Sequence, residues 1–303
     1  MKRLFFIIFL PVIAVGAMWS QGQSEGMRKL SLADFAITNL YVDEVDENKL
    51  VEDAIRGMLD KLDPHSTYTT AEETREMNEP LQGNFSGVGI QFNMNKDTLY
   101  VIQTIVGGPS EKVGILAGDR IIAVNDTTIA GVKMKNTDIM KRLRGESGTV
   151  VRVTVLRKGV KEPIEFRIVR DKIPIYSIDA SYMADKETGY IRVSRFAVTT
   201  DKEFSDAIKE LKKKGMKNLI VDLQGNGGGF LTSAIAMADE FLDDGQSIVY
   251  TEGRRSPRDD AFASKRGQFQ KGKLVLLVDE SSASASEILS GAIQDWDRGI
   301  IVG

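Results

Sequence analysis

The feature that most constrains the fold is an alternation of apolar runs and helical segments in the last third of the chain. The apolar runs, which predict strands, are 190–193, 219–223, 274–278 and 300–302, and the segments with helical spacing are 200–214, 230–242 and 284–296. A run that is apolar throughout is typical of a strand covered on both faces, and alternating strands and helices build a mainly parallel sheet. The sequence therefore predicts an α/β domain. Its last strand coincides with the end of the sequence, so we expect this domain to be incomplete.

The helix at 200–214 has start and stop signals. Thr200 is followed three residues later by Glu203, which is the pattern of a capping box, so we expect Thr200 to be the N-cap. Gly215 is expected to end the helix.

A serine-rich turn lies where the strand at 274–278 meets the next helix. Residues 282–287 read Ser-Ala-Ser-Ala-Ser-Glu, and backbone N–H groups at a helix N-terminus favour developing negative charge. Such a turn can hold a nucleophilic serine together with half of an oxyanion hole. Serine is also a common helix cap. Local spacing leaves both interpretations open.

A glycine-rich turn follows the strand at 219–223. Its sequence at 225–229 is Gly-Asn-Gly-Gly-Gly, and consecutive glycines let backbone N–H groups face a bound oxygen. A dinucleotide-binding loop is excluded because Phe230 stands where that motif needs a small residue. A plain tight turn remains an alternative. Two such turns in one parallel sheet favour a shared site.

The earlier parts of the chain have different sequence patterns. Residues 28–78 are expected to be helical, with an amphipathic helix at 46–62 that Pro64 ends. Residues 84–170 predict short strands and turns. The glycine-rich stretch Gly87, Val88, Gly89 and Ile90 can bind a peptide carboxylate through backbone N–H groups, or it can be an ordinary hairpin entrance.

Composition excludes several chemistries. The 303 residues contain no cysteine, which removes thiol nucleophiles, disulfides and thiolate metal sites. The single histidine, His65, follows a predicted helix end, where a role in capping competes with a catalytic one. We expect no metal and no cofactor. The net charge of −3, without a basic cluster beyond 212–214, argues against nucleic-acid binding.

The N-terminus has the pattern of a secretion signal. Lys2 and Arg3 precede an apolar run at 4–17 that ends in Val-Gly-Ala, small residues suited to cleavage. The run is short for a membrane span, although an uncleaved anchor is the alternative and would be the protein's contact with a membrane. Either interpretation places the rest of the chain outside the cytoplasm, and we expect the periplasm.

Taken together, the motifs identify a family resemblance. The chain resembles the C-terminal processing peptidases, also called tail-specific proteases. The stretches that match that family are 41–43, 62–68, 87–90, 118–121, 189–192, 222–223 with 226–229, and 282–287. Each is weak alone, but their order and spacing together are specific, and they cover nearly the whole chain after the leader.

The resemblance implies a fold and a division into domains. The fold is α/β, a crotonase-like (ClpP/crotonase-type) ββα protease core with an inserted mostly-β PDZ domain and an N-terminal helical segment. The expected boundaries are a signal peptide at 1–20, the helical segment at 27–82, the PDZ domain at 84–171 and an incomplete protease core at 172–303.

The resemblance also implies residue roles. Ser284 matches the family's nucleophile, the N–H groups of Gly228 and Ala285 match its oxyanion hole, and Glu287 and Asp295 match acidic positions with supporting roles. Gly87, Val88, Gly89 and Ile90 match its carboxylate-binding loop. Gln224 and Gly227 depart from the family's common arginine and proline, but neither change alters a backbone donor.

The family's general base is a lysine roughly 25 residues beyond the nucleophile, which acts in its neutral form. That position lies past Gly303, so this chain lacks the lysine of the Ser-Lys dyad and is expected to be an inactive fragment of a longer protein.

The resulting hypothesis is a serine endopeptidase that recognises protein C-terminal tails through a PDZ domain. The partners are therefore protein substrates, and a homodimer is allowed. The first alternative is a non-catalytic PDZ peptide-binding protein with the same fold. The second is a crotonase-like enzyme acting on thioesters, which also uses paired N–H donors but needs neither a PDZ domain nor a serine at 284.

Overall fold

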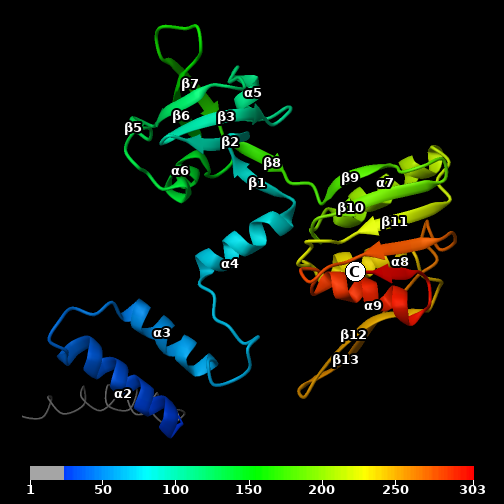
Figure 1. Ribbon diagram of the computed structural model, residues 1–303. Coiled ribbons are helices and arrows are strands. Elements are labelled where there is room, and N and C mark those ends of the chain that lie inside the picture. Colours follow the sequence, from blue (N-terminus) through cyan, green and yellow to red (C-terminus); the bar gives the residue numbers. More distant parts are fainter. Residues whose placement is uncertain (1–23) are drawn as a thin grey trace, which may run out of the picture. The chain divides into compact units, whose positions relative to one another are not determined.

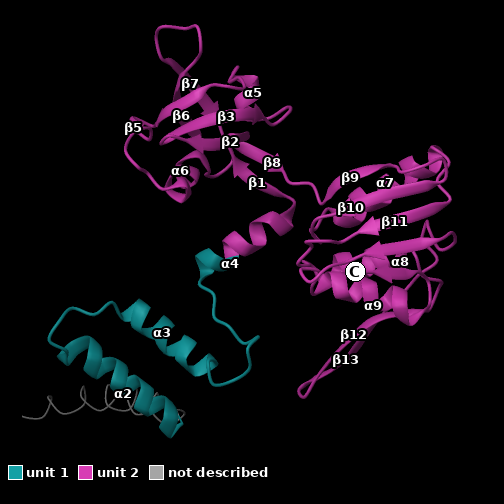
Figure 2. Cartoon of the chain, in the orientation of Figure 1, with its two compact units in different colours: residues 1–74 teal, residues 75–303 magenta. Residues whose placement is uncertain are grey.

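The computed structural model describes residues 24–303, which divide between Thr74 and Arg75 into two units (Figures 1 and 2). The predicted signal peptide at 1–20 lies outside the described residues. The other domain boundaries given above remain predictions, because the division into units does not test them.

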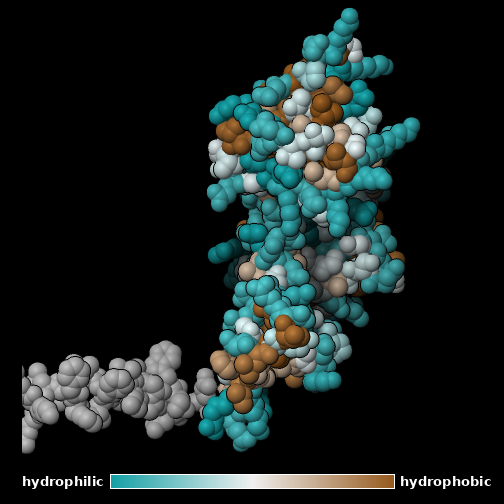
Figure 3. All heavy atoms as spheres, turned by 90° about the vertical axis from the view of Figure 1, so that its left-hand side faces the viewer, coloured by the Kyte–Doolittle hydropathy of each residue, from teal (hydrophilic) through white to brown (hydrophobic). Residues whose placement is uncertain are grey.

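The first unit is helical. Helix α2 spans Glu25–Leu40 and α3 spans Glu47–Leu59, and their N-caps, Ser24 and Asp46, accept N–H groups of the first turn. No residue of either helix is buried. Instead, large apolar side chains are exposed, among them Leu32, Phe35, Leu40 and Met58, and apolar patches are visible on the surface in Figure 3. Among the residues described, no helix has the length and apolar character to cross a membrane.

The second unit begins with a helical connector. Helix α4, Ala71–Asn78, crosses the division between the units, and the short 3-10 helix η1, Glu79–Gln82, follows it. Gly83 then turns the chain with φ 71°, a left-handed conformation that glycine adopts without cost. Strand β1, Asn84–Gly87, pairs antiparallel with β8, Asp171–Pro174, so both ends of the intervening segment lie together.

The segment between β1 and β8 is a mostly-β module. Its strands are β2 (Ile90–Asn95), β3 (Thr98–Thr104), β4 (Arg120–Val124), β5 (Thr127–Thr128), β6 (Val150–Leu156) and β7 (Ile164–Val169). They pair antiparallel in the order β2-β3-β4-β6-β7, with β5 beside β4. Helices α5, Pro109–Lys112, and α6, Asn136–Leu143, complete it. Buried residues alternate with outward ones in β3 and β6, and together with Ile121 and Val124 of β4 they form a core of their own.

The last segment contains the predicted parallel sheet, and this part of the fold prediction is confirmed. Its strands are β9 (Ile178–Met183), β10 (Thr188–Val193), β11 (Asn218–Asp222), β14 (Leu274–Leu277) and β15 (Ile300–Val302), in the order β15-β14-β11-β10-β9. The pairs β10–β11, β11–β14 and β14–β15 are parallel, and β9 is antiparallel to β10.

Three connections of this sheet are helical. Helices α7 (Thr200–Lys213), α8 (Leu231–Asp239) and α9 (Ala285–Asp295) pack against the strands (Figure 1). Phe204 of α7, Met237 of α8 and Leu289 of α9 belong to the same buried core. Because parallel strands end at one edge, the turns after β11 and β14 meet there.

The capping-box prediction for α7 is wrong. The N-cap is Thr199, and Thr200 is the first helical residue, with its hydroxyl accepting the Ala197 N–H at 2.7 Å. The Glu203 carboxylate accepts the N–H groups of Ser177 and Ile178 at 2.7 and 3.2 Å. The Glu203 carboxylate therefore binds N–H groups at the start of β9, and not the N–H group of the N-cap residue as a capping box would require.

One hairpin was not predicted. Strands β12, Ser247–Gly253, and β13, Ser256–Phe262, pair with each other and project from the sheet (Figure 1). Most of their residues are exposed, so they lack the apolar run or regular alternation that predicts a strand.

Candidate functional site

Ser284 lies directly before α9 on a strained turn. Its φ of 56° and ψ of −110° are rare for a residue with a side chain and cost on the order of 1–3 kcal/mol. Such a conformation persists only where the surrounding structure enforces it. The Ser284 N–H donates to the Glu287 carboxylate at 2.6 Å, so Glu287 holds this turn. Ser284 itself is exposed. The residue is thus accessible at the positive end of a helix, where anions are favoured.

Ala285 is the first residue of α9 and is fully buried. Within residues 24–303, its backbone N–H donates to no other protein atom. The first N–H groups of a helix have no partner inside the helix, and they are satisfied by caps, water or ligands. The Ala285 amide is therefore available to a bound oxygen.

Gly228 lies against the serine turn. A Cβ atom built on it would come within 2.8 Å of both the Ser284 Cβ and the Ala283 carbonyl oxygen, and within 3.0 Å of the Ala285 nitrogen. Its φ of 103° is also one that favours glycine. The structure thus brings Gly228, Ser284 and Ala285 together at one edge of the sheet.

The Gly228 N–H is already engaged. It donates to the Oδ1 atom of Asn226 at 2.9 Å, and Asn226 is fully buried. An oxygen bound at this edge must either share the Gly228 N–H with the Asn226 Oδ1 atom or replace Oδ1 as its acceptor.

Asp279 and Ser282 tie the two turns together. The Asp279 carboxylate accepts the Gly225 N–H, with both oxygens 3.0 Å from the nitrogen. The Gly225 N–H bond is the main reason that the pKa of Asp279 lies below its usual value. The Ser282 hydroxyl donates to the Leu223 carbonyl at 2.8 Å. The segment at Leu223 and Gly225, just before Gly228, is therefore bonded at two points to the turn that carries Ser284.

Two further candidates from the sequence lie elsewhere. Asp295 is the last residue of α9, and at about 1.5 Å per residue the helix separates it from Ser284 by roughly 16 Å. The structure does not bring Asp295 to Ser284. His65 belongs to the first unit, where its backbone N–H donates to the Asp63 carboxylate at 2.9 Å. That bond belongs to a local turn after α3.

The glycine-rich loop of the mostly-β module borders a groove. In the described part of the chain, the N–H groups of Val88 and Gly89 donate to no protein acceptor. The groove has a volume of about 160 Å³, and its walls are formed by Phe85, Gly87, Val88, Gly89, Ile90, Phe92, Met140, Leu143 and Arg144. Most of these side chains are apolar, so the groove combines free N–H donors with an apolar floor.

Arg144 stands at the edge of this groove, after α6. Its guanidinium lies 4.9 Å from the centre of the Phe85 ring and forms an ion pair with Glu79 of η1. Arg144 is therefore held between the groove and the connector that leads into the module.

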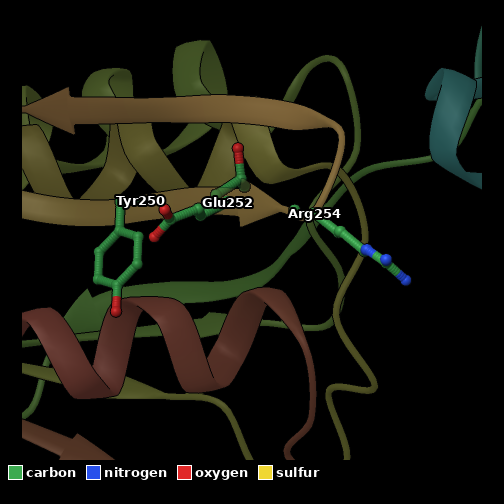
Figure 4. A pocket seen from close by; sticks show the side chains of 5 residues that line it. Tyr250, Glu252 and Arg254 are labelled. Atoms are coloured by element: carbon green, nitrogen blue, oxygen red, sulfur yellow. The ribbon is translucent and has the colours of Figure 1, made fainter.

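A separate open depression lies at the hairpin. Residues Tyr250, Thr251, Glu252, Gly253 and Arg254 line about 790 Å³ of open space, and Figure 4 shows Tyr250, Glu252 and Arg254 projecting from β12 and its turn. The Arg258 guanidinium lies over the Tyr250 ring at 3.9 Å and pairs with Asp260. Arg258 and Asp260 therefore find their charged and aromatic partners within the hairpin itself.

Sequence reasoning missed the role of Asn226 and Asp279. The sequence identifies Asn226 only as part of the glycine-rich turn. Asp279 directly follows the strand at 274–278, and a carboxylate at the end of a buried strand beside a serine turn is a signal that could have found it.

Models of three known families match parts of the chain. The family model of peptidase family S41 matches residues 187–303, a PDZ domain model matches residues 86–168, and the model of the activating protease CtpB N-terminal domain matches residues 14–74.

Several proteins are similar over most of the chain. The carboxy-terminal-processing protease of Bartonella bacilliformis is 38% identical over 87% of this chain and 61% of its own length. The carboxy-terminal processing protease CtpA of Bacillus subtilis is 33% identical over 99% of this chain and 67% of its own length. The chain therefore spans between 61% and 67% of the length of these relatives. Among solved structures, a photosystem II D1 C-terminal processing protease is 27% identical, with a TM-score of 0.47, over 92% of this chain and 81% of that one.

Proposed function

The chain belongs to the carboxy-terminal processing proteases of peptidase family S41, and on that premise we propose that the protein is a serine endopeptidase that binds protein C-termini through its PDZ domain and cleaves with Ser284. The observation that carries the proposal is the backbone contact between Gly228 and the Ser284–Ala285 turn. A nucleophile and N–H donors on converging turns are what acyl transfer requires.

In the proposed reaction, the Ser284 hydroxyl oxygen bonds to the carbonyl carbon of the scissile peptide and gives its proton to a general base. The carbonyl oxygen becomes an oxyanion, which the N–H groups of Ala285 and Gly228 stabilise. The C–N bond then breaks, and the base returns the proton to the leaving amine. Water attacks the acyl-enzyme in the same way and frees Ser284.

The general base is assigned by the family resemblance. It is a lysine roughly 25 residues beyond Ser284, past the sequence given, and it must be neutral to accept the proton. We expect residues 1–303 alone to hydrolyse little, and the protein that carries this lysine to be active.

The PDZ module supplies recognition in this proposal. The N–H groups of Val88 and Gly89 would bind the terminal carboxylate of a substrate, and the apolar groove beside them would take its last side chain. Tails that end in an apolar residue are therefore the expected ligands.

The test uses the complete protein and a folded substrate with an apolar C-terminal tail. Ser284→Ala is expected to abolish cleavage while leaving tail binding unchanged. Ser281→Ala is the matched control, because Ser281 is an exposed serine of the same loop. Continued cleavage by the Ser284→Ala protein would show that Ser284 is not the nucleophile.

A non-catalytic peptide-binding protein is the second candidate. It requires no general base, and within residues 24–303 no hydrogen bond or ion pair joins the Ser284 hydroxyl to a basic side chain. This candidate predicts tail binding without cleavage, and a complete sequence without lysine at the expected distance.

Two further proposals concern location and assembly. The pattern at 1–20 supports export from the cytoplasm, which secretion of a fusion to residues 1–30 would test.

The exposed apolar side chains of α2 and α3 support a homodimer, which light scattering of the protein with and without residues 1–74 would test.

A further inference from the structure

Asn226 is fully buried between the two turns of the candidate site. Its Nδ2 atom donates to the carbonyl of Val193, at the end of β10, at 2.9 Å. Its Oδ1 atom accepts the Gly228 N–H at 2.9 Å. One side chain thus links a strand of the sheet to the amide proposed for the oxyanion hole.

The backbone of Asn226 reaches the other turn. Its carbonyl oxygen accepts the Ser286 hydroxyl at 2.9 Å and the Ala283 N–H at 3.2 Å. Ala283 and Ser286 flank Ser284, and Ser286 is fully buried. Asn226 therefore fixes the glycine turn against the residues on either side of the proposed nucleophile.

We propose that Asn226 is a positioning residue of the reaction: its Oδ1 atom holds the Gly228 N–H beside Ser284 and gives up that hydrogen to the substrate oxygen as charge develops there. This inference rests on the proposed function.

Hydrogen-bond strength explains the exchange. The amide oxygen of Asn226 is a neutral acceptor, and a hydrogen bond to an ionised acceptor is roughly twice as strong. The Gly228 N–H therefore favours Oδ1 while the substrate carbonyl is neutral and favours the oxyanion once it forms. An interaction that strengthens only in the transition state raises kcat rather than substrate affinity. The Nδ2 bond to Val193 keeps the side chain in place during the exchange.

The experiment measures kcat and KM of the complete protein. Asn226→Asp keeps the shape and the Oδ1 acceptor but places a negative charge beside the forming oxyanion. We expect kcat to fall by about 100-fold or more, the effect of losing one oxyanion donor, while KM changes little. Ser286→Ala removes a bond to the Asn226 carbonyl and should lower kcat by roughly fivefold, the equivalent of about one hydrogen bond.

Ser233→Ala is the matched control. Ser233 is also a buried serine whose hydroxyl donates to a backbone carbonyl, that of Ala197 at 2.7 Å, but this bond does not reach Asn226. Its kcat should stay that of the parent protein. Thermal melting and tail-peptide binding show that each variant is folded.

A merely structural Asn226 would reduce the amount of folded enzyme without separating kcat from KM. The proposal is overturned if folded Asn226→Asp retains the parent kcat. If that variant does not fold, an equal kcat for Ser286→Ala and Ser233→Ala overturns it. Failure of the proposed function is a separate result: the Ser284→Ala protein would still cleave the substrate.

Discussion

Gly228 packs closely against Ser284, since a Cβ atom built on Gly228 would lie 2.8 Å from the Cβ atom of Ser284. The glycine motif and the serine motif are more than fifty residues apart in the sequence. Their contact is what turns two ordinary strand-to-helix turns into one candidate site.

Gly228→Ala is expected to destabilise the protein and abolish cleavage. The new methyl group meets Ser284 and the Ala283 carbonyl, and φ 103° is strained for alanine, so we expect a loss of about 2–4 kcal/mol in the free energy of unfolding. Urea unfolding measures it. Gly227→Ala is the control, because nothing lies within 4 Å of its Cβ position and its φ is not positive. Equal stability of the two variants would contradict the close contact.

Asp279→Asn should destabilise the protein in a pH-dependent way. Hydrogen bonds, first that from the Gly225 N–H, hold the pKa of Asp279 below its usual 3.8. A lowered folded-state pKa means that the ionised group stabilises the fold above pH 3.8 and that this contribution is lost as the pH falls through the folded pKa. Unfolding curves of both proteins should therefore differ at neutral pH and converge in acid. A difference that persists unchanged in acid would refute the assignment.

Tyr190 should titrate at a higher pH than an unperturbed tyrosine. Burial, together with its hydrogen bond to the Asp222 carboxylate, raises the pKa of Tyr190 to about 12. Because this pKa is raised, the stabilisation is complete below pH 10.0 and is lost between 10.0 and about 12. Ultraviolet absorbance of the phenolates follows the titration, and Tyr190→Phe should remove the step at about pH 12. If the variant loses its absorbance change near pH 10.0 instead of near pH 12, Tyr190 ionises normally and the assignment is wrong.

Arg157→Leu should lower the free energy of unfolding of the PDZ module. Asp119 is 1% exposed, and its carboxylate pairs with the Arg157 guanidinium at 2.7 Å. Removing one partner of a buried pair costs about 3 kcal/mol, because the other charge stays buried. Arg152→Leu is the control, since it breaks the exposed pair with Asp126, worth less than about 1 kcal/mol. Denaturant unfolding compares the two, and similar losses would contradict the difference in burial.

Much of the fold followed from local patterns. The apolar runs at 219–223 and 274–278 became β11 and β14, and the helical spacing after Ser284 became α9, because strands covered on both faces and helices with one buried face have distinct periods. The hairpin β12–β13 was not predicted because its residues are mostly exposed and show no regular alternation of apolar and polar side chains. The Thr200–Glu203 pattern failed because Glu203 finds donors at Ser177 and Ile178, far away in sequence.

The sequence by itself determined the α/β class, the two turns that carry serine and glycine, and the family to which they point, because these depend on residue order and local spacing. Only the tertiary structure decided that Gly228 touches Ser284 and that the Asn226 carbonyl accepts the Ser286 hydroxyl. The physical reason is that parallel strands bring distant turns to one edge of a sheet, and hydrogen bonds between those turns depend on distances that no local pattern encodes.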